Sequence, residues 1–237
     1  MIDFHTHILP AVDDGSKDIE MTEAMLEMES SMGVKHIVAT PHFYAHKMGV
    51  EDFVRRRAAA FDSIVPLLET AVPMDIRLGA EVYYFDGIGR ADKLAELLVE
   101  GTKTLLLEMP FCAWDEHVYS DVHDLIVKKN YRVVLAHIER YPEFQKKPFF
   151  GKSVFDRVLE LPLILQINAG SFYGDRKKTK FCDKLIENGN DIIIGSDCHN
   201  LTSRQPNLEK AESYIASNYG EGVFEEMQSL CKEVSGI

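Results

Sequence analysis

Short apolar segments alternate with longer amphipathic segments along almost the whole chain, and this alternation restricts its fold more than any other feature. The apolar segments are rich in Val, Ile and Leu, as expected of parallel strands that are buried on both faces. The predicted strands are Ile2–Phe4, His36–Thr40, Ile76–Glu81, Thr104–Glu108, Arg132–His137, Leu163–Asn168 and Ile192–Asp197.

The segments between these strands are predicted to be helices. Gly33, Gly101 and Gly189 follow three of them, at the position where a helix C-terminus favours a left-handed residue. The predicted helices are Lys17–Met32, Asp52–Ala71, Ala91–Glu100, Glu116–Asn130, Val154–Leu161, Phe181–Asn188 and the run from Leu208 to Val234. This alternation predicts a parallel α/β sheet, most simply a closed barrel, and a chain of 237 residues is a normal size for one such domain over residues 1–237.

Composition excludes several classes of protein. The formal net charge of −12 opposes binding to the phosphate backbone of nucleic acid. We expect no membrane span, because no apolar run reaches the required length of about 18 residues, and the N-terminus does not read as a signal peptide. The four cysteines show no CxxC pairing, which indicates reduced thiols and a cytoplasmic protein.

A His, Asp or Glu residue stands at the end of six of the seven predicted strands, and only the strand that ends at Asn168 lacks one. His5 and His7 are two residues apart, so both side chains can face one metal ion. The other residues of this set are His42, Glu81, Glu108, His137, Asp197 and His199. Because the carboxyl ends of barrel strands share one face, we predict a metal site there. Imidazole and carboxylate ligands suit Mn, Fe or Zn, and their number suggests more than one ion.

Three further features have two interpretations each. Asp14 is either another ligand or a turn acid before Gly15. Arg140 and Arg204 either bind phosphoryl oxygens or form surface ion pairs. Aromatic residues near the strand ends either pack in the core or form an apolar rim for an aromatic substrate. They are Phe43, Tyr44, Tyr83, Tyr84, Phe85, Phe111, Trp114, Phe172 and Tyr173.

Several motifs resemble those of the polymerase and histidinol phosphatase superfamily. They are HTH at 5–7, TPH at 40–42, GAE at 79–81, LLLE at 105–108, AHIERY at 136–141 and GSDCH at 195–199. The opening MIDFHTHILPAVDDG is especially similar to the bacterial manganese-dependent protein-tyrosine phosphatases of capsule and exopolysaccharide operons.

This resemblance implies a distorted (β/α)7 barrel with three metal ions, Mn²⁺ before Fe or Zn, at the C-terminal face of the strands. It implies nine ligands: His5, His7, Asp14, His42, Glu81, Glu108, His137, Asp197 and His199. It places Arg140 and Arg204 near the phosphate, and we expect Glu108 to bridge two ions. The implied reaction is hydrolysis of phosphotyrosine by metal-activated water. The implied partner is the tail of a bacterial tyrosine autokinase that regulates polysaccharide synthesis.

Other functions stay open from the sequence. A small-molecule phosphatase, such as a histidinol-phosphate phosphatase, has the same kind of site. An amidohydrolase also begins with HxH on a barrel strand, although Glu81 and Glu108 fit that class less well. A non-catalytic metal-binding scaffold is the third alternative. The oligomeric state is undetermined: the Met-rich helix Lys17–Met32 could pack against another subunit, but we expect it to cover the barrel.

Overall fold

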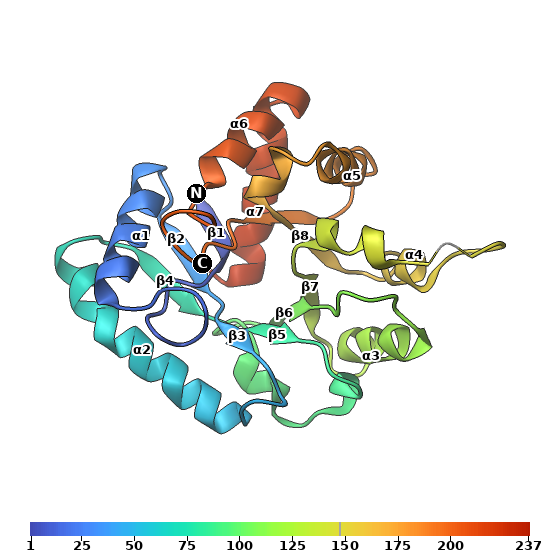
Figure 1. The fold of residues 1–237 in the computed structure, drawn as a ribbon, viewed down its shortest axis with the longest axis horizontal. Coiled ribbons are helices and arrows are strands. Elements are labelled where there is room, and N and C mark those ends of the chain that lie inside the picture. Colours follow the sequence, from blue (N-terminus) through green and yellow to red (C-terminus); the bar gives the residue numbers. More distant parts are fainter. Residues whose placement is uncertain (147) are drawn as a thin grey trace.

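The computed structural model describes residues 1–146 and 148–237 (Figure 1). The described residues form nine strands, and every pairing between them is parallel. The strands are β1 (Ile2–Thr6), β2 (His36–Ala39), β3 (His42–Phe43), β4 (Asp75–Leu78), β5 (Glu81–Tyr83), β6 (Thr104–Glu108), β7 (Arg132–Leu135), β8 (Ile164–Asn168) and β9 (Ile192–Gly195). One sheet has the order β1-β2-β4, and the other has the order β3-β5-β6-β7-β8-β9.

The two sheets join into one distorted barrel. On one side, β3 continues the course of β2 after a break at Pro41, and β5 continues β4 after a break at Gly79 and Ala80. The predicted strand 36–40 corresponds to β2, and β3 begins only after Pro41, which has no N–H to donate to the ladder. The predicted strand 76–81 is divided between β4 and β5. On the other side, β9 meets β1 through a bridge between Thr6 and Cys198.

Helices surround the barrel (Figure 1). They are α1 (Ile19–Ser31), α2 (Val50–Thr70), α3 (Glu116–Val127), α4 (Val154–Val158), α5 (Arg176–Glu187), α6 (Leu208–Tyr219) and α7 (Glu221–Ser235). Short 3-10 turns are η1 (Ile88–Arg90), η2 (Lys93–Leu97), η3 (Ile138–Arg140), η4 (Pro142–Phe144) and η5 (Ala169–Phe172). The methionine-rich α1 buries Met25 and Leu26 in the main core, as expected for a helix that covers the barrel.

Three predicted helices differ from the structure. The helix predicted at Phe181–Asn188 begins five residues earlier, at Arg176, where Asp175 accepts the amides of the first turn. The predicted helix Ala91–Glu100 is only the short η2, partly because Arg57 donates to the Glu96 carbonyl and Val99 donates to Thr104 across the turn. The predicted C-terminal helix is divided into α6 and α7 at Gly220, whose φ of 96° lies in the region that favours glycine.

The last helix, α7, closes the end of the barrel where the strands begin. The side chain of Gln228 accepts the Ile2 amide at 2.6 Å, and the hydroxyl of Thr104 donates to the Val234 carbonyl at 2.6 Å. Cys231 and Val234 pack with apolar residues of several strands in the barrel interior. The opposite end, where the strands finish, carries the polar site.

Candidate metal centre

The structure brings all nine predicted ligands together at the carboxyl end of the barrel. His5, His7 and Glu81 are completely buried, whereas the side chain of Asp14 is 67% exposed on the loop after β1. Eight of the nine residues form three groups whose polar atoms lie close enough to hold a metal ion. His137, the ninth, contacts two members of these groups.

The first group consists of His5, His7, Glu81 and Asp197. The Nε2 atoms of His5 and His7 lie 3.1 Å apart, and each is 3.2 Å from Oε2 of Glu81. Oδ1 of Asp197 lies 3.6 Å from His5 Nε2 and 3.5 Å from His7 Nε2. Ligands bound at about 2.0–2.2 Å from one cation would be separated by about 3.0–3.6 Å, so these separations fit a coordination sphere.

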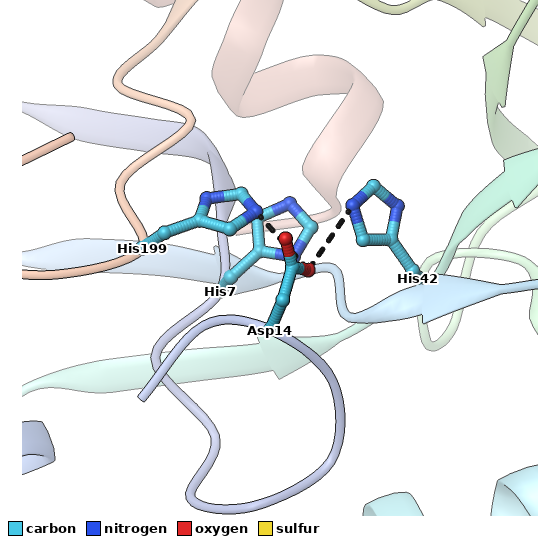
Figure 2. Close-up of side chains that lie close together, drawn as sticks. All are labelled: His7, Asp14, His42 and His199. Carbon is cyan, nitrogen blue, oxygen red and sulfur yellow. Dashed lines mark ion pairs between the residues drawn. The ribbon is translucent and has the colours of Figure 1, made fainter. Parts of the chain in front are cut away.

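The second group consists of His7, Asp14, His42 and His199, shown in Figure 2. Oδ1 of Asp14 lies 3.5 Å from Nε2 of His42 and 3.6 Å from Nε2 of His199. Burial and the neighbouring His7 lower the pKa of His199 to about 3, so its ring is neutral near pH 7, as a metal ligand must be.

The third group consists of His42, Glu81 and Glu108. Nδ1 of His42 lies 2.9 Å from Glu81 and 3.7 Å from Glu108. Nε2 of His137 lies 2.9 Å from Oε1 of Glu81 and 3.6 Å from Oε1 of Glu108. Burial and the charge of Glu81 raise the pKa of Glu108 to about 7, and a bound cation would reverse this effect.

The choice of bridging carboxylate changes with this geometry. Glu108 was the expected bridge, but it belongs to one group of ligands, whereas Glu81 belongs to two. Glu81 also reaches four histidines from a completely buried position. Glu81 is therefore the better candidate for a bridging carboxylate.

Several buried polar atoms of the site fit a bound cation because they have no hydrogen-bond partner within the described residues. They are His42 Nδ1, Glu81 Oε2, Glu108 Oε2 and His199 Nε2. An unpartnered polar atom in the interior loses free energy unless something binds it. The shared location and the nitrogen and oxygen chemistry of these atoms match a divalent metal.

Hydrogen bonds at Nδ1 orient the imidazoles of His5 and His199 so that Nε2 faces the site. Nδ1 of His5 lies 2.9 Å from Gln166 Oε1, and that atom also accepts the His137 amide at 2.7 Å. Nδ1 of His199 lies 2.9 Å from the Asp197 carbonyl oxygen. A ring that donates from Nδ1 keeps a lone pair on Nε2, which is the tautomer that binds metal through Nε2.

Asp13 is a functional candidate that sequence reasoning missed. Its Oδ2 lies 2.6 Å from Nδ1 of His7 and accepts the His42 amide at 2.8 Å, while its Oδ1 accepts the Gly15 amide at 2.9 Å. Burial opposes the charged form, but His7 outweighs it and holds the pKa of Asp13 well below its usual range. The two adjacent acids of the DDG motif are the sequence signal for Asp13.

Strand β8 supplies no predicted ligand, yet two of its side chains connect ligands. The amide nitrogen of Gln166 donates to Asn168 Oδ1 at 2.9 Å, and Asn168 donates to Asp197 Oδ2 at 2.7 Å. Together with the contact between Gln166 and His5, this chain of hydrogen bonds links β1 to Asp197, which follows β9. The apparent exception among the strand ends is thus a positioning strand.

The two predicted arginines converge on Asp197. Arg204 donates from Nη2 to Asp197 Oδ1 at 2.7 Å, and Arg140 Nη1 lies 4.0 Å from Oδ2. The Arg204 and Arg140 side chains are 38% and 37% exposed, so both are accessible from solvent. The guanidinium of Arg140 also lies 4.6 Å from the centre of the Phe111 ring.

Backbone strain occurs at two of the predicted ligands. His137 has a φ of 33° and Asp197 a φ of 54°, both in the left-handed region that favours glycine. A residue with a side chain costs about 1–2 kcal/mol there. The conformation is kept because it directs the ligand side chains of these two turns toward the site.

The aromatic residues near the strand ends divide into core and rim. Phe43, Tyr84, Trp114 and Phe172 are buried in the main core. At the site, Tyr44 lies beside His42 and Tyr83, with ring centres 5.2 and 5.5 Å apart respectively. Phe111 stacks on His137 with a centre distance of 6.0 Å. The rim is therefore smaller than the sequence suggested.

Comparison with known proteins decides the family. The sequence profile described as "Capsular polysaccharide synthesis, CpsB/CapC" matches residues 1–232. The chain belongs to the CpsB/CapC family. This confirms the resemblance that the motifs indicated.

Two relatives are similar to this CpsB/CapC chain over most of its length. Tyrosine-protein phosphatase YwqE of Bacillus subtilis is 29% identical over 225 residues, covering 93% of this chain and 85% of the relative. Tyrosine-protein phosphatase CpsB of Streptococcus pneumoniae is 29% identical over 231 residues, covering 93% and 91%.

Solved structures confirm the barrel fold. A chain from crystal structures of YwqE from Bacillus subtilis and CpsB from Streptococcus pneumoniae, described as metal-dependent tyrosine phosphatases, aligns with a TM-score of 0.82 at 24% identity. The alignment covers 100% of this chain and 94% of that one. Histidinol phosphate phosphatase from Lactococcus lactis aligns with a TM-score of 0.52 at 12% identity, covering 98% and 93%.

None of the helices in the described ranges combines the length and apolar character needed to cross a membrane.

Proposed function

We propose that this chain is a metal-dependent protein-tyrosine phosphatase. Its proposed substrate is phosphotyrosine on the tail of a bacterial tyrosine autokinase that regulates polysaccharide synthesis, and its proposed unit is one domain over residues 1–237. Membership of the CpsB/CapC family and the two phosphatase relatives support this function. The observation that carries it is the convergence of unpartnered buried ligand atoms and two guanidinium groups at one end of the barrel.

The nine predicted ligands are proposed to hold the metal ions, most simply three ions for three groups of ligand atoms. Mn²⁺ is the proposed ion, and Fe or Zn also suits nitrogen and carboxylate ligands. When bound, such ions supply hydroxide near neutral pH and neutralise phosphoryl charge.

Arg140 and Arg204 are proposed to bind the phosphoryl oxygens. Both guanidinium groups are directed at the carboxylate of Asp197, an anion that also offers paired oxygens. An arriving phosphate would compete for these donors, and paired N–H groups match its oxygens bidentately. The guanidinium of Arg140 also lies over the Phe111 ring, and this contact would help to orient the side chain for the phosphate. A phenol is a better leaving group than an alkyl alcohol, so a strong general acid is not required.

The experiment removes metal with a chelator and measures hydrolysis of an aryl phosphate before and after Mn²⁺ is added. We expect the loss and the return of turnover. His42→Ala and Arg140→Ala should lose most turnover and stay folded. Arg157→Ala is the matched control, since Arg157 lies 4.3 Å over the Tyr119 ring, a comparable stacking arrangement away from the predicted ligands. Turnover that resists chelation, or none with any metal, would refute the proposal.

The alternatives have their own measurements. Rates on a phosphotyrosine peptide and on histidinol phosphate separate a protein phosphatase from a small-molecule phosphatase. Binding of Mn²⁺ without turnover of any phosphoester would indicate a metal-binding scaffold. A cytoplasmic location is part of the proposal, because the four cysteines are free thiols, as is usual in a reducing compartment.

A further inference from the structure

A cavity of about 520 Å³ opens beside the part of the site that contains Asp14 and His42, and we name it the side pocket. Its volume lies within the range of about 300–1,000 Å³ that is usual for ligand pockets. Apolar side chains line much of it, among them Val12, Met48 and Phe53. The pocket therefore continues from the proposed metal centre onto an apolar surface.

Two basic side chains, Lys47 and Arg56, also line the side pocket. Nζ of Lys47 lies 3.9 Å from the centre of the Tyr44 ring, and Arg56 donates to the neutral carbonyl of Ala11. Among the described residues, neither cation forms an ion pair with a carboxylate, whereas the adjacent Arg55 pairs with Asp52. Two cations without a carboxylate partner in one pocket are notable in a chain whose formal net charge is −12.

The two acids that line the side pocket, Asp13 and Asp14, form no ion pair with these two cations. The carboxylate of Asp13 is occupied by His7 and by the amides of His42 and Gly15. The carboxylate of Asp14 is directed at His42 and His199 (Figure 2). Lys47 and Arg56 therefore remain available to bind an anionic group of a ligand in the side pocket.

We propose that the side pocket is a substrate subsite for an anionic side chain that neighbours the scissile phosphotyrosine in the peptide. The inference rests on the proposed function and extends it to sequence preference. Lys47 and Arg56 would bind the anion, and the apolar surface around Met48 and Phe53 would contact its methylene groups or ring. Aspartate, glutamate and a second phosphotyrosine share this chemistry.

The test uses the Mn²⁺-loaded full chain and phosphotyrosine peptides that differ only beside the scissile residue. The neighbour is Asp, a second phosphotyrosine, Ala or Lys, and kcat and KM are measured for each. We expect a lower KM with the two anionic neighbours, by about two- to fivefold for each exposed cation that is engaged. Raised salt should reduce the preference, because exposed charges are screened.

Variants then assign the preference to the side pocket. Lys47→Ala and Arg56→Gln should each bring the ratio of kcat/KM between the Asp and Ala peptides closer to one, and Lys47→Glu should favour the Lys peptide. Arg55→Ala is the matched control and should leave the ratio unchanged, because Arg55 does not line the pocket. Equal KM for all peptides, or a preference that survives the Lys47 and Arg56 variants, would overturn the subsite. No hydrolysis of any peptide would instead overturn the proposed function.

Discussion

The role of Asp13 leads to a prediction about metal affinity. Asp13→Asn keeps the size of the side chain but removes its charge and one acceptor oxygen. The native carboxylate receives three N–H groups, from His7, His42 and Gly15. An amide has only one oxygen for them, so its NH₂ group must face at least one N–H. If NH₂ faces Nδ1 of His7, the favoured tautomer moves the ring proton to Nε2, the nitrogen that faces Glu81 and Asp197.

Two independent values give the expected loss of Mn²⁺ affinity. Hydrogen bonds to charged groups contribute about 1.5–3 kcal/mol each, and the contact at 2.6 Å between Asp13 and His7 is the one at stake. Loss of a hydrogen-bond partner behind a metal-binding histidine usually weakens metal affinity by about 10- to 100-fold. At about 1.4 kcal/mol per tenfold change, the two values agree. We therefore expect Asp13→Asn to bind Mn²⁺ about 10- to 100-fold more weakly.

The assay titrates chelator-stripped protein with Mn²⁺ and follows both heat and turnover. The curve should move to higher Mn²⁺ while much of the turnover returns at saturation, because no proposed ligand has been removed. Asp18→Asn is the control, because it makes the same change of side chain at a residue outside the predicted ligand set. Asp18 is the N-cap of α1, and asparagine caps helices about equally well. An unchanged Mn²⁺ affinity in Asp13→Asn would refute the reasoning.

Three other substitutions test separate parts of the structure. Gly195→Ala would put a methyl group 2.6 Å from Cβ of His5, so we expect the free energy of unfolding in urea to fall by about 1–3 kcal/mol. An unchanged free energy of unfolding would show that β1 can shift to make room. Burial and the charge of Asp3 raise the pKa of Glu29 well above its ordinary value of 4.5, so the folded chain keeps a proton that the unfolded chain releases. That contribution is complete below pH 4.5 and is lost as the pH rises above it, so Glu29→Gln should remove this loss of stability. The same pH dependence of unfolding in both chains would contradict this. Arg204→Ala should lower kcat/KM for aryl phosphate by about 100-fold, with Arg204→Lys in between, and equal rates for Lys and Arg would exclude a bidentate contact.

Much of the barrel could be predicted because buried parallel strands have a strong sequence signature. The course from β6 to β9 follows the predicted strands within a few residues, since each is a continuous apolar run. The strand β3 and the break at Gly79 were not predicted, because a two-residue strand has no sequence pattern of its own and Gly79 lies within a predicted strand. The segment Ala91–Glu100 has helical composition, but contacts from distant Arg57 and Thr104 take up its backbone groups.

The sequence predicts which residues come together at the site, but it does not predict which contacts hold them in place. Strand ends share one face of a barrel, so His5 and Glu81 could be expected to meet. The left-handed backbone at His137 and Asp197 has no signature in residue type, since glycine would be the usual choice there. Gln166 also escaped notice, because an amide within a strand resembles any polar residue until its partners are known.

Glu81 has a consequence for how the chain would take up metal. Its carboxylate belongs to two ligand groups, so an ion bound in one group fixes the side chain that the next ion needs. Two sites that share an ordered ligand are energetically coupled, and the coupling acts equally in both directions. We therefore expect loading to be cooperative, with a turnover curve against Mn²⁺ that is steeper than for independent sites. Partial chelation would then leave a mixture of active and inactive molecules instead of a uniform population of weakened enzyme.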